Sequence, residues 1–299
     1  MSRSIVVLFS LLSFCAGPHG NGDESGGMAN IDKKFGAKVL DAIVLRDRIR
    51  TGEFDYTLDI LLPGDNLVRT RQEGTLLFDY DVGCQLHYYK IATRAESETE
   101  DVIGLKKSPF LRGGVITGPE TTLVISPDAD HGFEIATPEK SSFADVPFEF
   151  RSFGHALYGD YMIKTPFDRV LTGYLSFNDP PFSKLKGGQF VYKGGSLQFT
   201  LDPNKDFWIT SLRNERSEYK VVEKRAVPTG RKILDTGCEI KLAQVNGMWL
   251  PEKVTYQSSL AGTQHISMVW KSLNVEIPAE RFDKAELVKL TEKPFRVGP

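Results

Sequence analysis

The sequence predicts a mainly β protein of the α+β class, in which a curved antiparallel sheet carries an N-terminal helix and a mid-chain helical lid. The first observation is a two-residue alternation of apolar and polar side chains, which recurs between residues 56 and 270 and is typical of half-buried strands. The second is a set of tight-turn sequences between these runs, of which Asn246-Gly247 is the strongest. The third is that only two segments, 33–51 and 165–174, have helical features.

The N-terminus has the features of an export signal. Arg3 precedes an apolar run of about ten residues, from Ile5 to Phe14, which is too short to span a bilayer. We therefore expect a signal peptide over 1–17, a flexible linker over 18–31 and a single domain over 32–299, located in the periplasm or cell envelope. Leu12 to Cys15 resembles a bacterial lipobox, although Phe14 replaces the usual small residue. Lipidation of Cys15, with membrane anchoring, and ordinary cleavage near it are the two alternatives.

The first half of the domain begins with the expected helix. Residues 33–51 carry an apolar stripe and end in a basic turn, and Gly52 is expected to cap the helix. A strand then follows over 56–62. Strands over 71–80 and 84–93 form a predicted hairpin, and two short strands follow at 121–126 and 133–137.

The second half begins with a predicted helix and continues as strands. Thr165 and Pro166 form a helix start, and Phe167 and Leu171 lie on the apolar side of that helix. The strands that follow are expected over 197–202, 208–213, 218–224, 233–245, 249–258 and 266–277. The apolar phase slips between Trp270 and Leu273, which predicts a bulge or bend.

The segment after the Asn246-Gly247 turn contains a proline that a central strand does not tolerate. Trp249 and Pro251 follow the turn almost at once. Because proline has no N–H to donate, we expect Pro251 at the rim of the sheet, before the hydrogen-bond ladder begins. Cys84 and Cys238 both lie on the apolar phase of their strands, where burial as separate thiols is favoured over a disulfide.

The sequence contains no motif that marks catalysis. H-E-x-x-H, G-x-S-x-G, C-x-x-C and phosphate-binding glycine loops are all absent, so we expect no cofactor, no metal and no enzyme activity. Asp128 to Gly132 fits a polar turn better than a calcium loop, and His155 has no recognisable nucleophile as a partner. The net charge of -2 provides no basic footprint for nucleic acid.

A long antiparallel sheet curls, and its concave face must be covered. Either the cover fills the core, or it leaves an apolar hollow for a lipid or acyl chain. The candidate cavity residues are the apolar positions of the strands and of the lid helix: Leu58, Ile60, Phe167, Leu171, Leu197, Phe199, Leu201, Ile240, Val254, Tyr256, Met268 and Trp270.

Two late segments, GMWLP (Gly247 to Pro251) and WKSLNVEIP (Trp270 to Pro278), resemble those of the lipoprotein-carrier superfamily, the LolA/LolB-like half-barrels. FRSFGHALYGDY, with TPFDRVL after it, resembles the mid-chain helical insertion of large exported relatives of unknown role. In that superfamily an open antiparallel barrel, lidded by helices, holds acyl chains. The resemblance implies a half-barrel over roughly residues 33–285 and a lipid or an acylated protein as the partner.

These observations lead to one main hypothesis and two alternatives. The main hypothesis is an exported, non-enzymatic binding protein with an apolar cavity for a lipid or lipidated partner. The first alternative is a structural or regulatory module of the envelope with a filled core. The second is an exported hydrolase whose paired carboxylates no motif marks.

Overall fold

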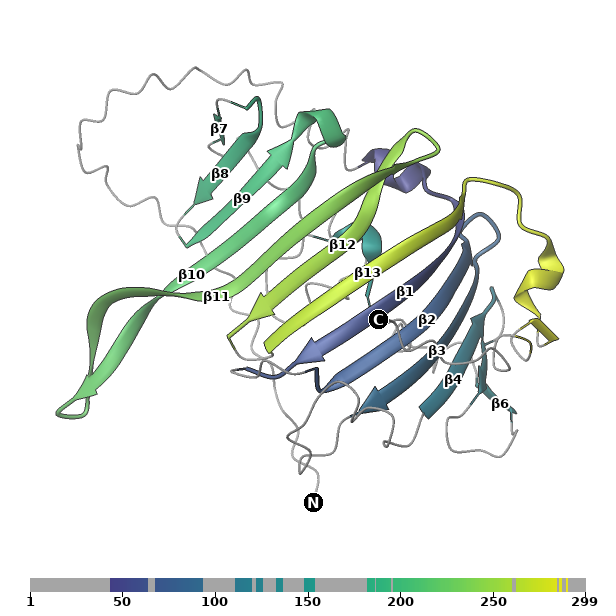
Figure 1. The fold of residues 1–299 in the computed structure, drawn as a ribbon, viewed down its shortest axis with the longest axis horizontal. Helices are drawn as coiled ribbons and strands as arrows, with labels where there is room; N and C mark the ends of the chain where they lie inside the picture. The colour runs from purple at the N-terminus through teal and green to yellow at the C-terminus, as the bar shows by residue number, and fades with distance from the viewer. Residues whose placement is uncertain are drawn as a thin grey trace.

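The computed structural model describes residues 44–63, 68–93, 111–119, 122–125, 133–136, 148–153, 182–185, 187–194, 196–259, 262–283, 285, 286 and 289. These residues form one open sheet of 13 antiparallel strands (Figure 1). The strands are β1 Thr51–Leu61, β2 Thr70–Asp79, β3 Cys84–Thr93, β4 Leu111–Thr117, β5 Thr122–Ile125, β6 Phe133–Ala136, β7 Phe182–Lys184, β8 Phe190–Gly194, β9 Leu197–Asp202, β10 Trp208–Val222, β11 Arg225–Val245, β12 Met248–Ser258 and β13 Gly262–Leu273. The 3-10 helices are η1 Arg46–Arg48, η5 Phe150–Ser152, η6 Pro203–Lys205 and η7 Ala279–Phe282.

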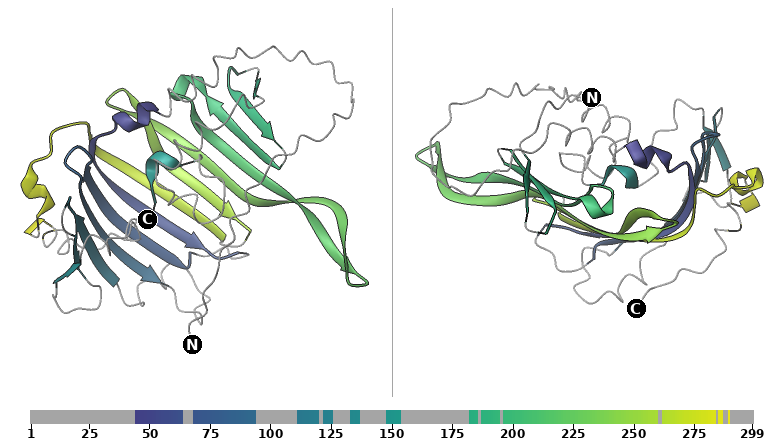
Figure 2. Two further views of the ribbon diagram at one scale, coloured as in Figure 1. Left: turned by 180° about the vertical axis from the view of Figure 1, so that it is seen from behind. Right: turned by 90° about the horizontal axis from the view of Figure 1, so that it is seen from above.

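The sheet consists of two meanders that meet at β1 and β13. Its strand order is β6-β5-β4-β3-β2-β1-β13-β12-β11-β10-β9-β8-β7, so each meander runs outward from this central pair. The sheet curves, and η1 and η5 lie on its concave side (Figure 2). The predicted mainly β, curved antiparallel architecture is therefore confirmed.

Strand alternation separates the two faces. In β13, Ile266 and Met268 are buried, whereas Ser267 and Val269, which alternate with them, are exposed. The buried set belongs to a large apolar cluster on the concave face. A smaller cluster on the convex face contains Leu77 and Leu86. The segment around η7 contributes to this second cluster, so the two clusters cover opposite faces of β2.

The predicted irregularity near the end of β13 is a β-bulge. Phe54 lies opposite Trp270 and Glu53 lies opposite Ser272, which leaves Lys271 as the extra residue. The bulge changes the phase of the apolar positions between Trp270 and Leu273. The prediction from the alternation is confirmed.

The turn between β11 and β12 is the predicted Asn-Gly turn. Asn246 and Gly247 have φ values of 48° and 80°, both in the left-handed region that this hairpin turn requires. Pro251 lies opposite Leu242, beside a register shift that leaves Glu252 as an extra residue. On its other edge β12 pairs with β13 only from Lys253 onward. The prediction that Pro251 precedes the ladder is therefore right for the β13 edge and wrong for the β11 edge, where a bulge accommodates it instead.

Gly52 is not a helix cap. The 3-10 helix η1 ends at Arg48, and β1 already begins at Thr51, so Gly52 lies within the strand. A Cβ atom at Gly52 would lie 2.8 Å from the Phe78 ring, so the position needs glycine for close packing and not for a left-handed turn. The rest of the expected helix, and the expected lid helix over 165–174, lie outside the described residues.

Two strands that the sequence predicted separately are one. β10 runs without interruption through 208–222, and β11 starts at Arg225 rather than at Ile233. The turn between them is formed by Glu223 and Lys224, whose φ values are 49° and 61°. Neither residue is a usual turn former, which is why the sequence did not reveal this hairpin.

Cys84 and Cys238 do not form a disulfide with each other. The predicted burial is confirmed for Cys238 and wrong for Cys84, which is partly exposed at the start of β3. None of the helical segments in the described ranges is long and apolar enough to cross a membrane.

Candidate functional site: the concave face of the sheet

Apolar side chains form a continuous row across the middle of the concave face. Leu58, Ile266, Val254 and Ile240 lie directly opposite one another on β1, β13, β12 and β11. All four side chains are buried. Because opposite residues of an antiparallel pair point to the same face, the register itself produces this row.

A second row runs beside the first and contains a polar side chain. It joins Ile60, Gln264, Tyr256, Cys238, Leu212 and Phe199 across six neighbouring strands. Gln264 is only 8% exposed, and its Oε1 atom has no hydrogen-bond partner among the residues that the structure describes. A buried, unsatisfied amide oxygen costs free energy, and binding sites are one place where such atoms occur.

The structure places ten of the predicted cavity residues on this one face. Leu58, Phe199, Leu201, Ile240, Val254, Tyr256 and Met268 are buried in the same cluster, and Ile60, Leu197 and Trp270 pack against it. Phe167, Leu171 and Cys15 lie outside the described residues. The alternation therefore located the face, while the role of its residues in binding a ligand stays a prediction.

An aromatic cluster covers one end of the concave face. The Phe150 ring lies 5.6 Å from the Phe54 ring and 5.1 Å from the Trp270 ring, both in edge-on arrangements. Phe148 lies over Phe54 at 6.2 Å, and Phe153 packs against Phe148 at 5.4 Å. Sequence reasoning missed these three phenylalanines as cover for the sheet. Their spacing in PFEFRSF was the only indication of it.

The second covering element, η1, is attached to the far meander through Arg46. This residue is 2% exposed, and its guanidinium lies 3.9 Å from the centre of the Trp208 ring. Arg46 Nη2 also donates to the Phe207 carbonyl at 3.5 Å. A cation over an indole ring is worth most when both are desolvated, so this contact holds η1 across the rim of the sheet.

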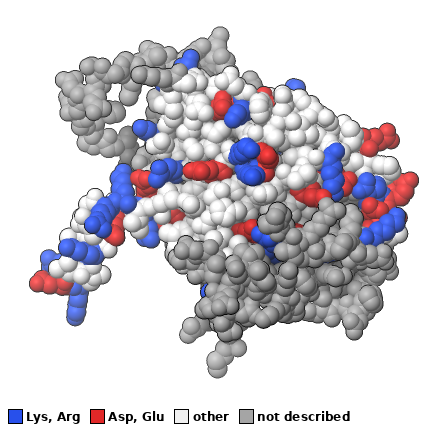
Figure 3. All heavy atoms as spheres, in the orientation of Figure 1, with Lys and Arg blue, Asp and Glu red and all other residues white. Residues whose placement is uncertain are grey.

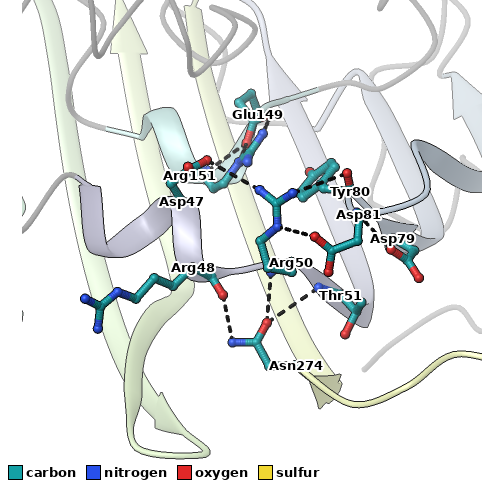
Figure 4. Close-up of polar contacts among 10 residues, drawn as sticks. All are labelled: Asp47, Arg48, Arg50, Thr51, Asp79, Tyr80, Asp81, Glu149, Arg151 and Asn274. Atoms are coloured by element: carbon teal, nitrogen blue, oxygen red, sulfur yellow. Dashed lines mark hydrogen bonds and ion pairs between the residues drawn. The ribbon is translucent and has the colours of Figure 1, made fainter.

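The same segment is attached to β1, β2 and β13 through Arg50 and Asn274 (Figure 4). Arg50 Nε donates to Asp81 Oδ1 at 2.7 Å. Asn274 Oδ1 accepts from the Arg50 backbone N–H at 2.9 Å, and Asn274 Nδ2 donates to the Arg48 carbonyl at 2.9 Å. Asn274 has a φ of 52°, a left-handed conformation that asparagine tolerates better than most residues.

Arg151 holds η5 in place beside this group (Figure 4). Its guanidinium lies 4.1 Å from the centre of the Tyr80 ring, and its Nε donates to Glu149 Oε1 at 3.0 Å. Burial, together with the charge of Glu149, raises the pKa of Tyr80 far above its ordinary value, so this phenol stays neutral. The rim contacts thus fix both covering segments to the end of the sheet where β1 begins.

Hydrogen bonds join Tyr56, Gln72 and His87 on the β1–β3 side of the concave face. Tyr56 Oη lies 2.7 Å from His87 Nε2 and accepts from Gln72 Nε2 at 2.6 Å. Burial raises the pKa of Tyr56 well above its ordinary value of 10.0, against the opposing effect of the Gln72 hydrogen bond. The Tyr56 ring lies over Gly74, where a Cβ atom would be 2.6 Å from the hydroxyl. Gln72 is therefore engaged, in contrast with Gln264.

The convex face has a different character. Acidic and basic side chains are interspersed over it (Figure 3). Lys271, in the bulge, donates to Glu53 at 3.0 Å and to Asp55 at 2.5 Å. Partial burial alone would lower the pKa of Lys271, but these two hydrogen bonds raise it above its ordinary value. Neighbouring Val269 is 67% exposed.

Within the described residues, no three His, Cys, Asp or Glu side chains are placed to hold a metal ion. The acidic segment 128–132 and His155 lie outside those residues. The described part of the concave face is therefore a buried apolar cluster, with the unsatisfied amide oxygen of Gln264 beside it.

Two solved structures match most of this chain, at low identity and with a low TM-score. No protein-family model matches the chain, and no curated protein matches its sequence. A LolA superfamily protein from Nitrosomonas europaea matches with 11% identity and a TM-score of 0.39, over 84% of this chain and 99% of that one. A DUF1329 family protein from Desulfovibrio piger matches with 12% identity and a TM-score of 0.39, over 84% of this chain and 98% of that one. At such values, this chain's own residues must support any assignment of function.

Proposed function

We propose that this chain is an exported, non-enzymatic binding protein whose concave face holds the acyl chain of a lipid or of an acylated protein. The observation that supports this proposal is the pair of apolar rows that run across adjacent strands in register. Burying apolar surface is the main favourable term in such binding. On the convex face, the described residues form a smaller apolar cluster, which contains Leu77 and Leu86.

The second row, which crosses six strands, has a suitable length for an acyl chain. Six strands spaced about 4.8 Å apart span about 24 Å. One leaflet of a bilayer has a hydrocarbon layer about 15 Å thick, which is half of the usual core. An acyl chain therefore fits along the second row without leaving the sheet.

Gln264 narrows the class of ligand. Its Oε1 atom is an acceptor in an otherwise apolar row, between Ile60 and Tyr256. A ligand hydroxyl or amide N–H would satisfy it, whereas a plain hydrocarbon would leave it unsatisfied. The proposed ligand is thus an amphiphile that carries a hydrogen-bond donor near its acyl chain.

The proposed location follows from the N-terminus. A leader over 1–17 and a linker over 18–31 would place the domain in the periplasm or envelope, and acylation of Cys15 would tether it to a membrane. Mass spectrometry of the protein from its native envelope tests this step. A soluble mature form without Cys15 would exclude the tether.

The binding proposal is tested with delipidated protein and fluorescent fatty acids and phospholipids. Ile60→Ala, on the concave face, should weaken binding about tenfold, since a lost apolar contact is worth about 1–3 kcal/mol. Val269→Ala, on the convex face, is the matched control and should bind as the wild type does. Absence of uptake of every amphiphile by the wild type would refute the proposal.

A filled-core envelope module is the second candidate. The observation in its favour is the dense aromatic cover of Phe148, Phe150 and Phe153 over Phe54 and Trp270. Such a module would unfold at the same temperature with and without amphiphile, because it has no ligand to bind.

A further inference from the structure

The hairpin of β10 and β11 extends far beyond the body of the sheet. β9 pairs with β10 only as far as Asn214, and β12 pairs with β11 only from Thr236. Residues 216–232, which we name the arm, have only each other as strand partners (Figure 1). The arm projects from one end of the sheet in every view (Figure 2). It can therefore reach a surface that the body does not touch.

One face of the arm is apolar. Tyr219 lies opposite Pro228, and Val221 lies opposite Ala226, so these four side chains share a face. Tyr219 is 60% exposed and Val221 is 79% exposed. Large exposed apolar side chains gathered on one element mark an interaction site.

The arm is also basic. It contains six Lys or Arg and two Asp or Glu, a net charge of +4 in a chain whose total is -2. Lys220 and Arg225 lie on the face opposite Val221, beside Val222 and Val227. One of the two acids, Glu218, accepts a hydrogen bond from Thr229 at 2.6 Å. Basic side chains cluster along the projecting hairpin (Figure 3).

We propose that the arm docks on the surface of an anionic lipid bilayer. Elements with an apolar face and surrounding Lys and Arg lie in the interface of such membranes, and their binding combines apolar burial with attraction to acidic headgroups. Tyrosine is enriched at that depth. This inference does not depend on the proposed ligand, since an arm can dock whether or not the concave face is occupied.

Pairing of the arm's edges with a partner strand explains the same residues less well. One register shift, at Ser217/Tyr219, interrupts the ladder within the arm, and another, at Asn214/Glu215, lies just before it. Bulges and edge lysines are features that discourage strand addition. The apolar face and the basic side chains of the hairpin then remain available to a surface.

The test measures vesicle binding of the chain from residue 18 onward, which lacks the leader and Cys15, so that no acyl anchor contributes in any sample. Vesicles of phosphatidylcholine with phosphatidylglycerol are compared with phosphatidylcholine alone. The wild type should bind the anionic vesicles and lose binding as salt increases. Lys220→Gln with Arg225→Gln should weaken binding about 25-fold, at about fivefold per basic residue near the surface.

Two body variants control for charge and for apolarity. Lys241→Gln with Lys253→Gln removes the same charge from exposed positions of the body and should change binding less than twofold. Val221→Asp should weaken binding at least tenfold, whereas Val269→Asp, at a similarly exposed valine, should not. Thermal unfolding confirms that each variant is folded.

Several outcomes would overturn the proposal. One is a wild type that does not bind anionic vesicles. Another is vesicle binding that the substitutions in the arm do not weaken. Binding to soluble polyglutamate but not to vesicles would assign the arm to an acidic polypeptide instead.

Discussion

Gln264 and Gln72 both lie on the concave face, but they differ in hydrogen bonding. Gln72 donates to Tyr56 at 2.6 Å, whereas Gln264 Oε1 has no partner. Gln264→Leu should therefore raise the free energy of unfolding of the empty protein by about 1–3 kcal/mol, the cost of a buried unsatisfied group. Gln72→Leu should lower it by about 0.5–1.5 kcal/mol, since a made hydrogen bond is lost. Urea unfolding measures both.

Ligand binding adds a second measurement on the Gln264→Leu variant. It should bind a hydroxylated amphiphile more weakly than the wild type, with little change for the matched amphiphile that lacks the donor. A stability loss on replacing Gln264 would show that its amide is already satisfied in the folded protein, and the polar contact to the ligand would then be rejected.

Glu73 should make the free energy of unfolding depend on pH. Burial raises its pKa above the ordinary value of 4.5, although Arg71 and Lys90 act in the opposite direction. Below that value the side chain is protonated in both the folded and the unfolded states. As pH rises above it, the unfolded chain releases the proton first, so folding loses stability between the ordinary pKa and the raised one. Glu73→Gln should remove this loss.

The measurement is the difference in free energy of unfolding between wild type and Glu73→Gln at about pH 4 and about pH 7. The advantage of the variant should grow with pH. A constant difference would mean that Arg71 and Lys90 fully compensate for burial.

The burial of a single residue was predictable where strand alternation alone determines it. Leu58, Val254 and Met268 are examples, because their burial follows from strand phase. Gln264 was also within reach, since it occupies the apolar phase of β13 two residues before Ile266. Arg46 was not, because the ring that it stacks on belongs to Trp208, 162 positions away, and only tertiary structure joins them.

Secondary-structure elements also divide into those that local sequence predicted and those that only the tertiary structure determines. The Asn246-Gly247 hairpin was predictable because both residues favour the left-handed conformation that the turn needs. The Glu223-Lys224 turn was not, because its residues have no such preference and long pairing of β10 with β11 imposes it. The prediction that Gly52 caps a helix was wrong, because a glycine after a basic run fits a crowded strand position as well as a helix cap.

Gly247 and Gly262 have similar φ values but different surroundings. Substituting each of them therefore distinguishes backbone strain from steric crowding in a turn. Gly247 has a φ of 80° with open space where an added methyl group would lie, and Gly262 has a φ of 83° with the Leu61 carbonyl against that position. Gly247→Ala should lower the free energy of unfolding by about 1–2 kcal/mol, the left-handed penalty. Gly262→Ala should lower it by more, since the loop around Leu61 must also move. Equal losses in urea unfolding of the two variants would mean that the loop yields freely.

At the scale of the molecule, the site depends on the pairing of β1 with β13. Leu58 meets Ile266 across that pair, although 208 positions separate them in the sequence. Alternation assigned each residue to a face, but strand order decides which rows become continuous. The sequence contains no local feature that fixes this order, and so the face was predictable and its rows were not.

Met268 and Val269 test the whole arrangement, because adjacent residues of β13 serve opposite faces. Met268 is 3% exposed and Val269 is 67% exposed. In the empty protein, Met268→Ala should lower the free energy of unfolding by about 2–5 kcal/mol if the concave face is tightly filled, and by less if it is a loosely packed ligand site. Val269→Ala should stay within about 0.5 kcal/mol of wild type.

Adding an amphiphile distinguishes the two functions. At a hundredfold excess over its Kd, a ligand should stabilise the wild type by about 2.7 kcal/mol, and Val269→Ala by the same amount. Met268→Ala should gain less, because it has lost part of the surface that the acyl chain contacts. Thermal unfolding of all three proteins, with and without the amphiphile, measures these gains. Two results together would reject the binding proposal: Met268→Ala lowers the free energy of unfolding by the full amount of about 2–5 kcal/mol, and the amphiphile stabilises none of the three proteins. The protein would then be a structural module with a filled core.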